Sequence, residues 1–380
     1  MLDVAFELIV YFAVRIYFGL ADCRLSEHCR EASFSDKILR IPRCTVLEEY
    51  IMSDIPAKPR ADRNVNLSIF RTPVAQLAIL AASLLSYSPV VGLAKDDPSI
   101  DDGKLRIVVF GAHPDDAEFK AGGTAAKWAR QGHHVKLCSV TNGDIGHWQM
   151  AGGPLAQRRA AESAAVAKKL GVTSQVLDLH DGELLPTLEN RKLITKVIRE
   201  WKADIVISHR PWDYHPDHRY VGILVQDAAF MVTVPFFCPD IAPLKKNPVF
   251  LYSSDGFQKP YPFKPDVVVS LDDVFDDKVE ALHELESQVY EGGASGSEEF
   301  VKKAPPASDV VGRKAWLKQR WHERQSAEAN KFRSELIRLY GEEAGKSIKY
   351  AEAFELCEYG RRPTEADLKQ LFPFFDRKTP

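Results

Sequence analysis

Histidine and aspartate side chains recur in two short segments of the chain, GAHPDDAE at residues 111–118 and PWDYHPDH at residues 211–218. A catalytic zinc site normally takes three such imidazole or carboxylate ligands from the protein and leaves the fourth position to water. His113 and Asp116 from the first segment and His218 from the second would form such a set. Because one carboxylate and two imidazoles suit zinc better than magnesium or calcium, the segments predict a Zn²⁺ site if the fold brings them together.

The other polar side chains of these segments could supply the chemistry around a metal. Asp115 is free to take a proton from a water molecule whose pKa the metal has lowered to about 7, and to pass that proton to a leaving amine. His215 could donate a hydrogen bond to a developing oxyanion. Asp217 could hold one imidazole by its other ring nitrogen. Together these residues predict a metal-dependent amide hydrolase.

Both segments directly follow a predicted strand. Short apolar runs rich in Val and Ile are expected to be buried parallel strands, at residues 106–110, 134–140, 174–179 and 204–208. Helical runs lie between them, and two of these end at Gly132 and Gly171. This alternation predicts an α/β fold, a Rossmann-like three-layer sandwich with a mostly parallel central sheet. Ligands bind at the carboxyl ends of the strands in such sheets, which is where both segments would lie.

Length and composition limit the partners of such a site. The chain has 380 residues, of which 45% are hydrophobic, and this is ample for a buried core. Its 50 basic and 53 acidic residues leave a formal charge of -3, so no global field attracts nucleic acid. The six cysteines form no CxxC pair, which argues against a zinc ribbon or a dense disulfide framework. The expected partner is a small molecule, and the oligomeric state is left open.

The N-terminal part of the chain has the pattern of a targeting segment. Met52 opens a stretch with several basic residues, an apolar run at 74–93 and small residues before a polar start, which are the parts of a secretory signal. Residues 52–95 are therefore expected to be a secretory signal, and residues 1–51 an upstream extension of the reading frame. The alternative is an uncleaved membrane anchor. The protein is expected to be exported, or else held at a membrane through this segment alone.

After the expected α/β domain at 105–290, the chain predicts a helical extension over 291–380. Residues 272–290 and 311–340 each have the pattern of one long amphipathic helix. The closing segment is expected to pack back on the core through Phe354, Leu356 and Tyr359.

The order of the motifs resembles that of a known family. AHPDDAE followed by GGT, TNGD, RxxE and DYHPDH is similar to the PIG-L/LmbE family of zinc-dependent deacetylases, which act on N-acetylglucosamine-type substrates. The resemblance covers residues 105–290 and implies hydrolytic deacetylation of an N-acetyl sugar or glycoconjugate, with the ligands, the base and the oxyanion-facing residue named above. It also implies a substrate-facing arginine, Arg159, with Glu162 after it. The chain departs from the usual family pattern at Lys120, where a small residue is common.

Several alternatives stay open from the residues alone. Asp116 could simply cap the helix after the first strand, although two His-Pro-Asp segments at equivalent strand ends make this the weaker interpretation. Asp144, in TNGDIG after the second strand, could bind sugar hydroxyls or belong to a turn. Nucleotide binding is disfavoured because the first loop lacks GxGxxG. The chain could instead be a non-catalytic sugar-binding module, against which Asp115 argues, or an amidase for a glycolipid or thiol-sugar conjugate.

Overall fold

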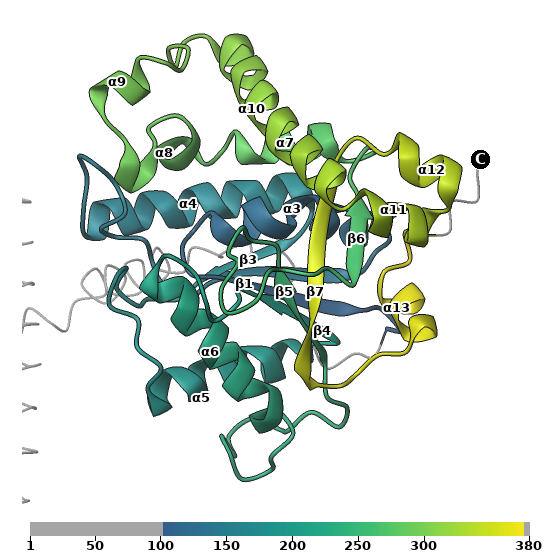
Figure 1. Ribbon diagram of the computed structural model, residues 1–380. Coiled ribbons are helices and arrows are strands. Elements are labelled where there is room, and N and C mark those ends of the chain that lie inside the picture. The colour runs from purple at the N-terminus through teal and green to yellow at the C-terminus, as the bar shows by residue number, and fades with distance from the viewer. Residues whose placement is uncertain (1–101, 376–380) are drawn as a thin grey trace, which may run out of the picture. The chain divides into compact units, whose positions relative to one another are not determined.

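A computed structural model describes residues 102–375, so the expected upstream extension (1–51) and secretory signal (52–95) lie outside the described residues. Its centre is a seven-stranded sheet in the order β3-β2-β1-β4-β5-β7-β6 (Figure 1). The first five strands in this order pair in parallel, whereas β7 runs antiparallel to both β5 and β6. The mostly parallel sheet of an α/β fold is thereby confirmed. The strands are β1 (Arg106–Gly111), β2 (His134–Ser139), β3 (Thr173–Val176), β4 (Ile205–Ser208), β5 (Val249–Ser253), β6 (Val267–Ser270) and β7 (Ala351–Gly360).

Helices cover both faces of the sheet and complete the predicted three layers (Figure 1). Ile107 and Val109 of β1 share one core with helices α3, α4 and α7, whereas Val108 and Phe110 share the other core with α5 and α6. None of the helices between residues 102 and 375 has the length and hydropathy that crossing a membrane requires. The helices up to residue 282 are α3 (Asp116–Arg130), α4 (Gly153–Leu170), α5 (Leu188–Trp201), α6 (Pro216–Met231) and α7 (Phe275–Leu282).

The strand order reverses at β1, which pairs with β2 on one side and with β4 on the other. Connections leave β1 and β4 toward opposite faces at such a point, and the crevice between them at the carboxyl ends of the strands is where α/β sheets bind ligands. The register pairs Val109 with Ile207. The loops that follow the two strands therefore start side by side, as the sequence predicts.

The C-terminal region contributes helices and also the strand β7. Each of the two long helices expected here is divided: α7 and α8 are separate, and α10 ends before Phe332, where α11 begins. Phe332 separates α10 from α11, and its buried ring packs against Phe263, with ring centroids 5.8 Å apart. Phe354 is buried in the core and Leu356 packs against it, as expected, but Tyr359 is 54% exposed, so its expected core contact is wrong. The remaining elements are α8 (Glu286–Val289), a 3-10 turn (Gly293–Ser295), α9 (Glu298–Val301), α10 (Val310–Lys331), α11 (Arg333–Tyr340), α12 (Glu342–Ser347) and α13 (Glu365–Leu371).

Candidate active site

The loop between β1 and α3 folds around the carboxylate of Asp116. Its Oδ2 accepts hydrogen bonds from the backbone N–H groups of Ala112 at 3.0 Å and His113 at 2.8 Å. Asp116 therefore does not cap α3 with its side chain, and the N-cap position falls on Asp115, which makes no side-chain cap bond. The capping interpretation of the HPDD segment is not what the structure has. The carboxylate instead holds the loop that precedes the helix.

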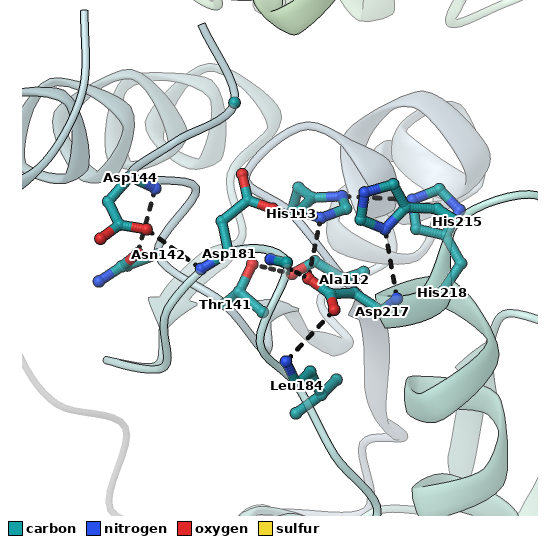
Figure 2. A network of polar contacts seen from close by, with 12 residues as sticks. Ala112, His113, Thr141, Asn142, Asp144, Asp181, Leu184, His215, Asp217 and His218 are labelled. Carbon is teal, nitrogen blue, oxygen red and sulfur yellow. Dashed lines mark hydrogen bonds and ion pairs between the residues drawn. The ribbon is translucent and has the colours of Figure 1, made fainter.

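The loop between β4 and α6 places the second set of side chains at the start of a helix. His215 is the N-cap residue of α6, and its Nδ1 accepts a hydrogen bond from the N–H of Asp217 at 3.2 Å. Pro216 begins the helix, where its fixed φ and missing N–H cost nothing. His218 follows within the first turn, so its imidazole points back over the loop. Figure 2 shows His113, His215 and His218 gathered at this place.

The three predicted metal ligands bring their donor atoms together in a nearly equilateral triangle. His113 Nδ1 lies 3.4 Å from Asp116 Oδ2 and 3.2 Å from His218 Nε2, and His218 Nε2 lies 3.3 Å from Asp116 Oδ2. Ligand atoms placed tetrahedrally at about 2.0–2.2 Å from zinc are separated by about 3.3–3.6 Å. The three separations are close to these values, and the residue types suit zinc, so the three side chains could hold such an ion.

Other groupings of donors in the described residues also come close, but their atoms are already engaged. One comprises Asp116, His209 and His218, and another contains His215. His209 Nε2 accepts from the N–H of Ala112 at 3.2 Å, and His215 Nδ1 accepts from Asp217. In the set of His113, Asp116 and His218 the two imidazole nitrogens accept no backbone hydrogen bond, and the Asp116 carboxylate, although its Oδ2 accepts two, carries the negative charge that a cation would need.

Carboxylates lie behind both ligand imidazoles. His113 Nε2 lies 3.0 Å from Asp181 Oδ1 and 3.4 Å from Asp217 Oδ2, and His218 Nδ1 lies 3.1 Å from Asp213 Oδ1. A ligand imidazole whose second nitrogen meets a carboxylate is fixed in tautomer and orientation and becomes a better donor to the metal. Asp217 is one of the carboxylates on the second nitrogen of His113, and its role there stays a prediction.

Asp217 also holds the loop that carries Asp181. Its side chain is fully buried, and it accepts from the backbone N–H groups of Gly182 at 2.7 Å and Leu184 at 3.3 Å (Figure 2). Its position is thus set by the β3–α5 loop as well as by His113. It orients groups around the site and does not itself face open space.

Asp115 and His215 have the properties of an acid/base pair beside the metal position. Burial raises the pKa of Asp115 to about 6, and the negative charge of Asp116 acts in the same direction. Burial lowers the pKa of His215, and the neighbouring His113 and His218 add to that shift. A neutral His215 whose Nδ1 accepts from the backbone must carry its proton on Nε2. It can therefore donate a hydrogen bond from that atom.

Arg159 and Asp144 were predicted to contact substrate, and the structure places both in the walls of the site. Arg159 is 2% exposed; its Nη2 donates to the carbonyl of Gly146, and its Nη1 lies 4.0 Å from Asp181 Oδ2. Asp144 is bonded to His180 Nδ1 at 2.8 Å and to the N–H of Asp181 at 3.1 Å. Both side chains fix loops that border the metal site, and their contact with substrate stays a prediction.

Sequence reasoning missed two residues of this site, His209 and Asp181. His209 directly follows β4 and its ring stacks on that of His218, with centroids 4.2 Å apart. Asp181 lies in the loop after β3, the neighbour of β2 in the sheet. The signal that could have found them is their position, since each is a polar residue after the carboxyl end of a parallel strand.

Comparison with known proteins agrees with this arrangement. A family model described as GlcNAc-PI de-N-acetylase (PIG-L) matches residues 108–229, which include both loops. The 4-oxalmesaconate hydratase of Pseudomonas putida is 24% identical over 48% of this chain and 73% of its own length. The fold is shared with the solved N,N'-diacetylchitobiose deacetylase of Pyrococcus horikoshii, at a TM-score of 0.50 and 22% identity, covering 75% of this chain and 93% of that one.

A further relative carries the family assignment. The diacetylchitobiose deacetylase of Thermococcus kodakarensis is 35% identical over 191 residues, which are 48% of this chain and 70% of that protein. This similarity covers most of the Thermococcus protein and therefore extends well beyond the two short motifs. The matched family model agrees with it. The chain belongs to the PIG-L family.

Proposed function

We propose that this protein is a zinc-dependent deacetylase that hydrolyses the amide of an N-acetylglucosamine-type sugar. The observation that carries the proposal is the triangle of His113 Nδ1, Asp116 Oδ2 and His218 Nε2, whose sides of 3.2–3.4 Å match tetrahedral zinc. It lies at the switch point of the sheet, between Asp115 and His215. Similarity to deacetylases of N-acetylated sugars supports the substrate class.

When bound at this triangle, zinc supplies a Lewis acid that acidifies water and polarises a carbonyl group. The residues around it supply the proton transfers. Asp115, whose pKa of about 6 is close to neutrality, can take a proton from the attacking water and later give it to the leaving amine. Splitting the amide in this way consumes one water and yields acetate and a free amino sugar.

His215 is the residue placed to stabilise charge on the amide oxygen. Its backbone-bonded Nδ1 leaves the Nε2 proton available for the oxygen that becomes negative as water adds. Asp181 and Asp217 hold His113, and Asp213 holds His218, so the donor atoms are in place before substrate binds. Little reorganisation is then needed when the substrate arrives.

The direct test is release of free amine by the zinc-loaded protein from a panel of N-acetylated sugars, including N-acetylglucosamine and N,N'-diacetylchitobiose. We expect Asp115→Asn to keep zinc bound and to lose about 100- to 10,000-fold in kcat, the usual contribution of a general acid/base. Bound zinc is measured by metal analysis after gel filtration. Unchanged turnover in Asp115→Asn would place the base elsewhere.

Two further variants separate metal loss from loss of the base. His218→Ala removes one corner of the triangle and should lose both zinc and turnover; full zinc occupancy in this variant would contradict the ligand assignment. Asp227→Asn serves as a control, because Asp227 lies on the same helix and pairs with Arg191 at 2.8 Å. It should retain zinc and turnover.

Hydration of a carbon–carbon double bond is a second candidate, favoured by the similarity to 4-oxalmesaconate hydratase. The same residues could activate water for that addition. A conjugated unsaturated dicarboxylate loses its ultraviolet absorbance on hydration, so one assay distinguishes this activity from amine release. A protein that binds the sugars but converts neither kind of substrate would be the non-catalytic binding module.

A further inference from the structure

Apart from the candidate active site, a polar cavity of about 250 Å³ lies beside α3. It is bounded by α10 of the C-terminal region and by the loop after β5. Its lining contains three cationic side chains from two helices, together with three carboxylates. The cations are Lys120, Arg324 and Lys331, and the carboxylates are Asp255, Glu328 and Glu352. None of these residues belongs to the metal triangle or to the carboxylates behind it.

Two of the three carboxylates are already neutralised by cations outside the lining. Asp255 accepts two hydrogen bonds from the guanidinium of Arg210, at 2.5 and 2.6 Å. Glu352 is paired with Lys278 Nζ at 2.6 Å and also accepts from the N–H of Gly123 at 2.9 Å. Neither is free to neutralise a cation of the cavity.

The three cations have no such partners. Lys120 Nζ donates to the backbone carbonyl of Ser254 at 2.6 Å, and Lys331 Nζ lies 3.4 Å from the carbonyl of Asp255. The guanidinium of Arg324 lies over the ring of Trp321, 4.8 Å from its centroid. Within residues 102–375, no carboxylate comes within ion-pair distance of any of them. Of the three carboxylates in the lining, Glu328 is thus the one that has no cation paired with it among the described residues, and the lining sets three cations against it.

Two cations of the cavity, Lys120 and Arg324, lie near enough to Asp116 to interact with its charge. Lys120 lies one turn beyond Asp116 on α3. Burial lowers the pKa of Arg324, and the negative charges of Glu328, Asp115 and Asp116 oppose this shift, so the guanidinium lies within the field of those carboxylates.

The loop after β5 has residues near both the cavity and the candidate metal site. It contributes Asp255 to the cavity, and two residues later the ring of Phe257 lies 6.5 Å from that of Tyr214. The Tyr214 ring in turn lies 5.4 Å from His218. The loop after β5 therefore lines the cavity and also contacts Tyr214, the aromatic residue beside His218.

We infer that Lys120, Arg324 and Lys331 form a subsite for an anionic group of the substrate, so that this protein acts on N-acetyl sugars carrying a phosphate or a carboxylate. The inference rests on the proposed deacetylase function. An arginine binds two oxygens of such a group at once, and lysines add charge without demanding a fixed geometry. The C-terminal region, through α10, would then contribute to substrate choice.

The test compares kcat/KM for anionic and neutral substrates with the same acetamido group. N-acetylglucosamine 6-phosphate, N-acetylglucosamine 1-phosphate and N-acetylmuramic acid are the anionic substrates, and N-acetylglucosamine is the neutral one. The wild-type protein should prefer at least one anionic substrate. Arg324→Gln should lower that anionic-to-neutral ratio about 10- to 100-fold, the effect of losing a charged hydrogen bond, and Lys120→Gln should lower it in the same direction.

Lys318→Gln is the matched control, because Lys318 lies on the same helix and pairs with Asp276 at the surface at 2.7 Å. It removes the same charge and should leave the ratio as in the wild type. If the wild type hydrolyses these sugars but Arg324→Gln and Lys120→Gln keep its ratio, the subsite is wrong and the deacetylase function stands.

Failure of the proposed function gives a different result. If the zinc-loaded wild type releases no amine from any of these sugars, the deacetylase proposal falls. The cavity is then tested by calorimetric titration with inorganic phosphate. Weaker binding by Arg324→Gln than by Lys318→Gln would keep the anion subsite, and equal binding by the two variants would overturn it as well.

Discussion

Both ligand imidazoles use one ring nitrogen for the metal position and the other for a carboxylate. Asp213 would therefore support the proposed metal site without being a ligand itself. Its Oδ1 contacts the second ring nitrogen of His218. Removal of such a supporting carboxylate typically weakens metal affinity because the imidazole loses its fixed tautomer and orientation.

We therefore expect Asp213→Asn to weaken zinc binding about 10- to 100-fold, with the fold intact. The measurement is a competition titration against a chelator of known zinc affinity, with circular dichroism as the check on folding. Asp227→Asn, already described as a surface control on α6, should bind zinc like the wild type. Equal zinc affinity in Asp213→Asn would show that the 3.1 Å contact to His218 is without consequence for the metal.

At the scale of single residues, the sequence predicts the side chains that belong to a short motif. It misses the side chains that other loops bring into the site. His113, Asp116 and His218 stand in repeated His-Pro-Asp segments, so their types and spacing are visible. Asp181 comes from a loop with no repeated pattern, and only the folded chain puts it 3.0 Å from His113.

At the scale of elements, the turn from β1 into α3 depends on one glycine. A Cβ at Gly111 would lie 2.7 Å from Asp116 Cβ and 2.8 Å from the backbone nitrogen of Ala117. Both distances are below normal contact, and the backbone atom cannot move without shifting the helix. The absence of a side chain at Gly111 is thus what lets the Asp116 carboxylate fold back over the loop.

Gly111→Ala should therefore reduce both zinc affinity and stability, the latter by about 1–3 kcal/mol, the usual cost of overpacking. Thermal unfolding and the zinc competition titration measure the two effects. Gly153→Ala at the start of α4 is the control, because an added Cβ there meets no atom within 4 Å. A Gly111→Ala protein with wild-type zinc affinity would show that the loop can relax around the new methyl group.

Strands that lead into the site are predictable because their apolar runs are continuous and their following loops carry the motifs. The breaks in the C-terminal helices cannot be predicted in this way, because the amphipathic pattern of the sequence continues through them. Phe332 has the apolar character expected inside a long amphipathic helix, so its residue type does not reveal the break. Its packing on Phe263 is visible only in the folded chain. Tyr359 lies where the pairing of β7 with β5 becomes irregular, between Leu356 and Gly360, and its side chain is exposed although Cys357 on the same face is buried.

At the scale of the whole molecule, a buried ion pair connects three elements. Lys278 of α7 and Glu352 of β7 have side chains that are 1% and 2% exposed, and Glu352 also accepts from Thr124 of α3. Because α3 carries Asp116 at its start, this pair ties the C-terminal strand to the helix that bears a metal ligand.

Lys278→Met should lower the free energy of unfolding by about 3–5 kcal/mol, because it leaves a buried carboxylate without its cation. The double variant Lys278→Met/Glu352→Gln should lose less than Lys278→Met, since the uncompensated charge is gone. Urea denaturation followed by tryptophan fluorescence measures both. Lys318→Met, which removes a lysine from an exposed pair, should change stability little. A double variant no more stable than Lys278→Met would show that charge is not the cause.

The place of β7 in the sheet also sets an order of events during synthesis. This strand pairs with β5 on one side and β6 on the other, and residues 351–360 leave the ribosome after the six other strands of the described sheet. Until they arrive, β5 and β6 expose unpaired edges to any neighbouring chain, and Glu352 is not yet there to bond the backbone of α3. A nascent chain can thus contain both loops of the proposed metal site, after β1 and β4, before the strand that closes the described sheet has been made.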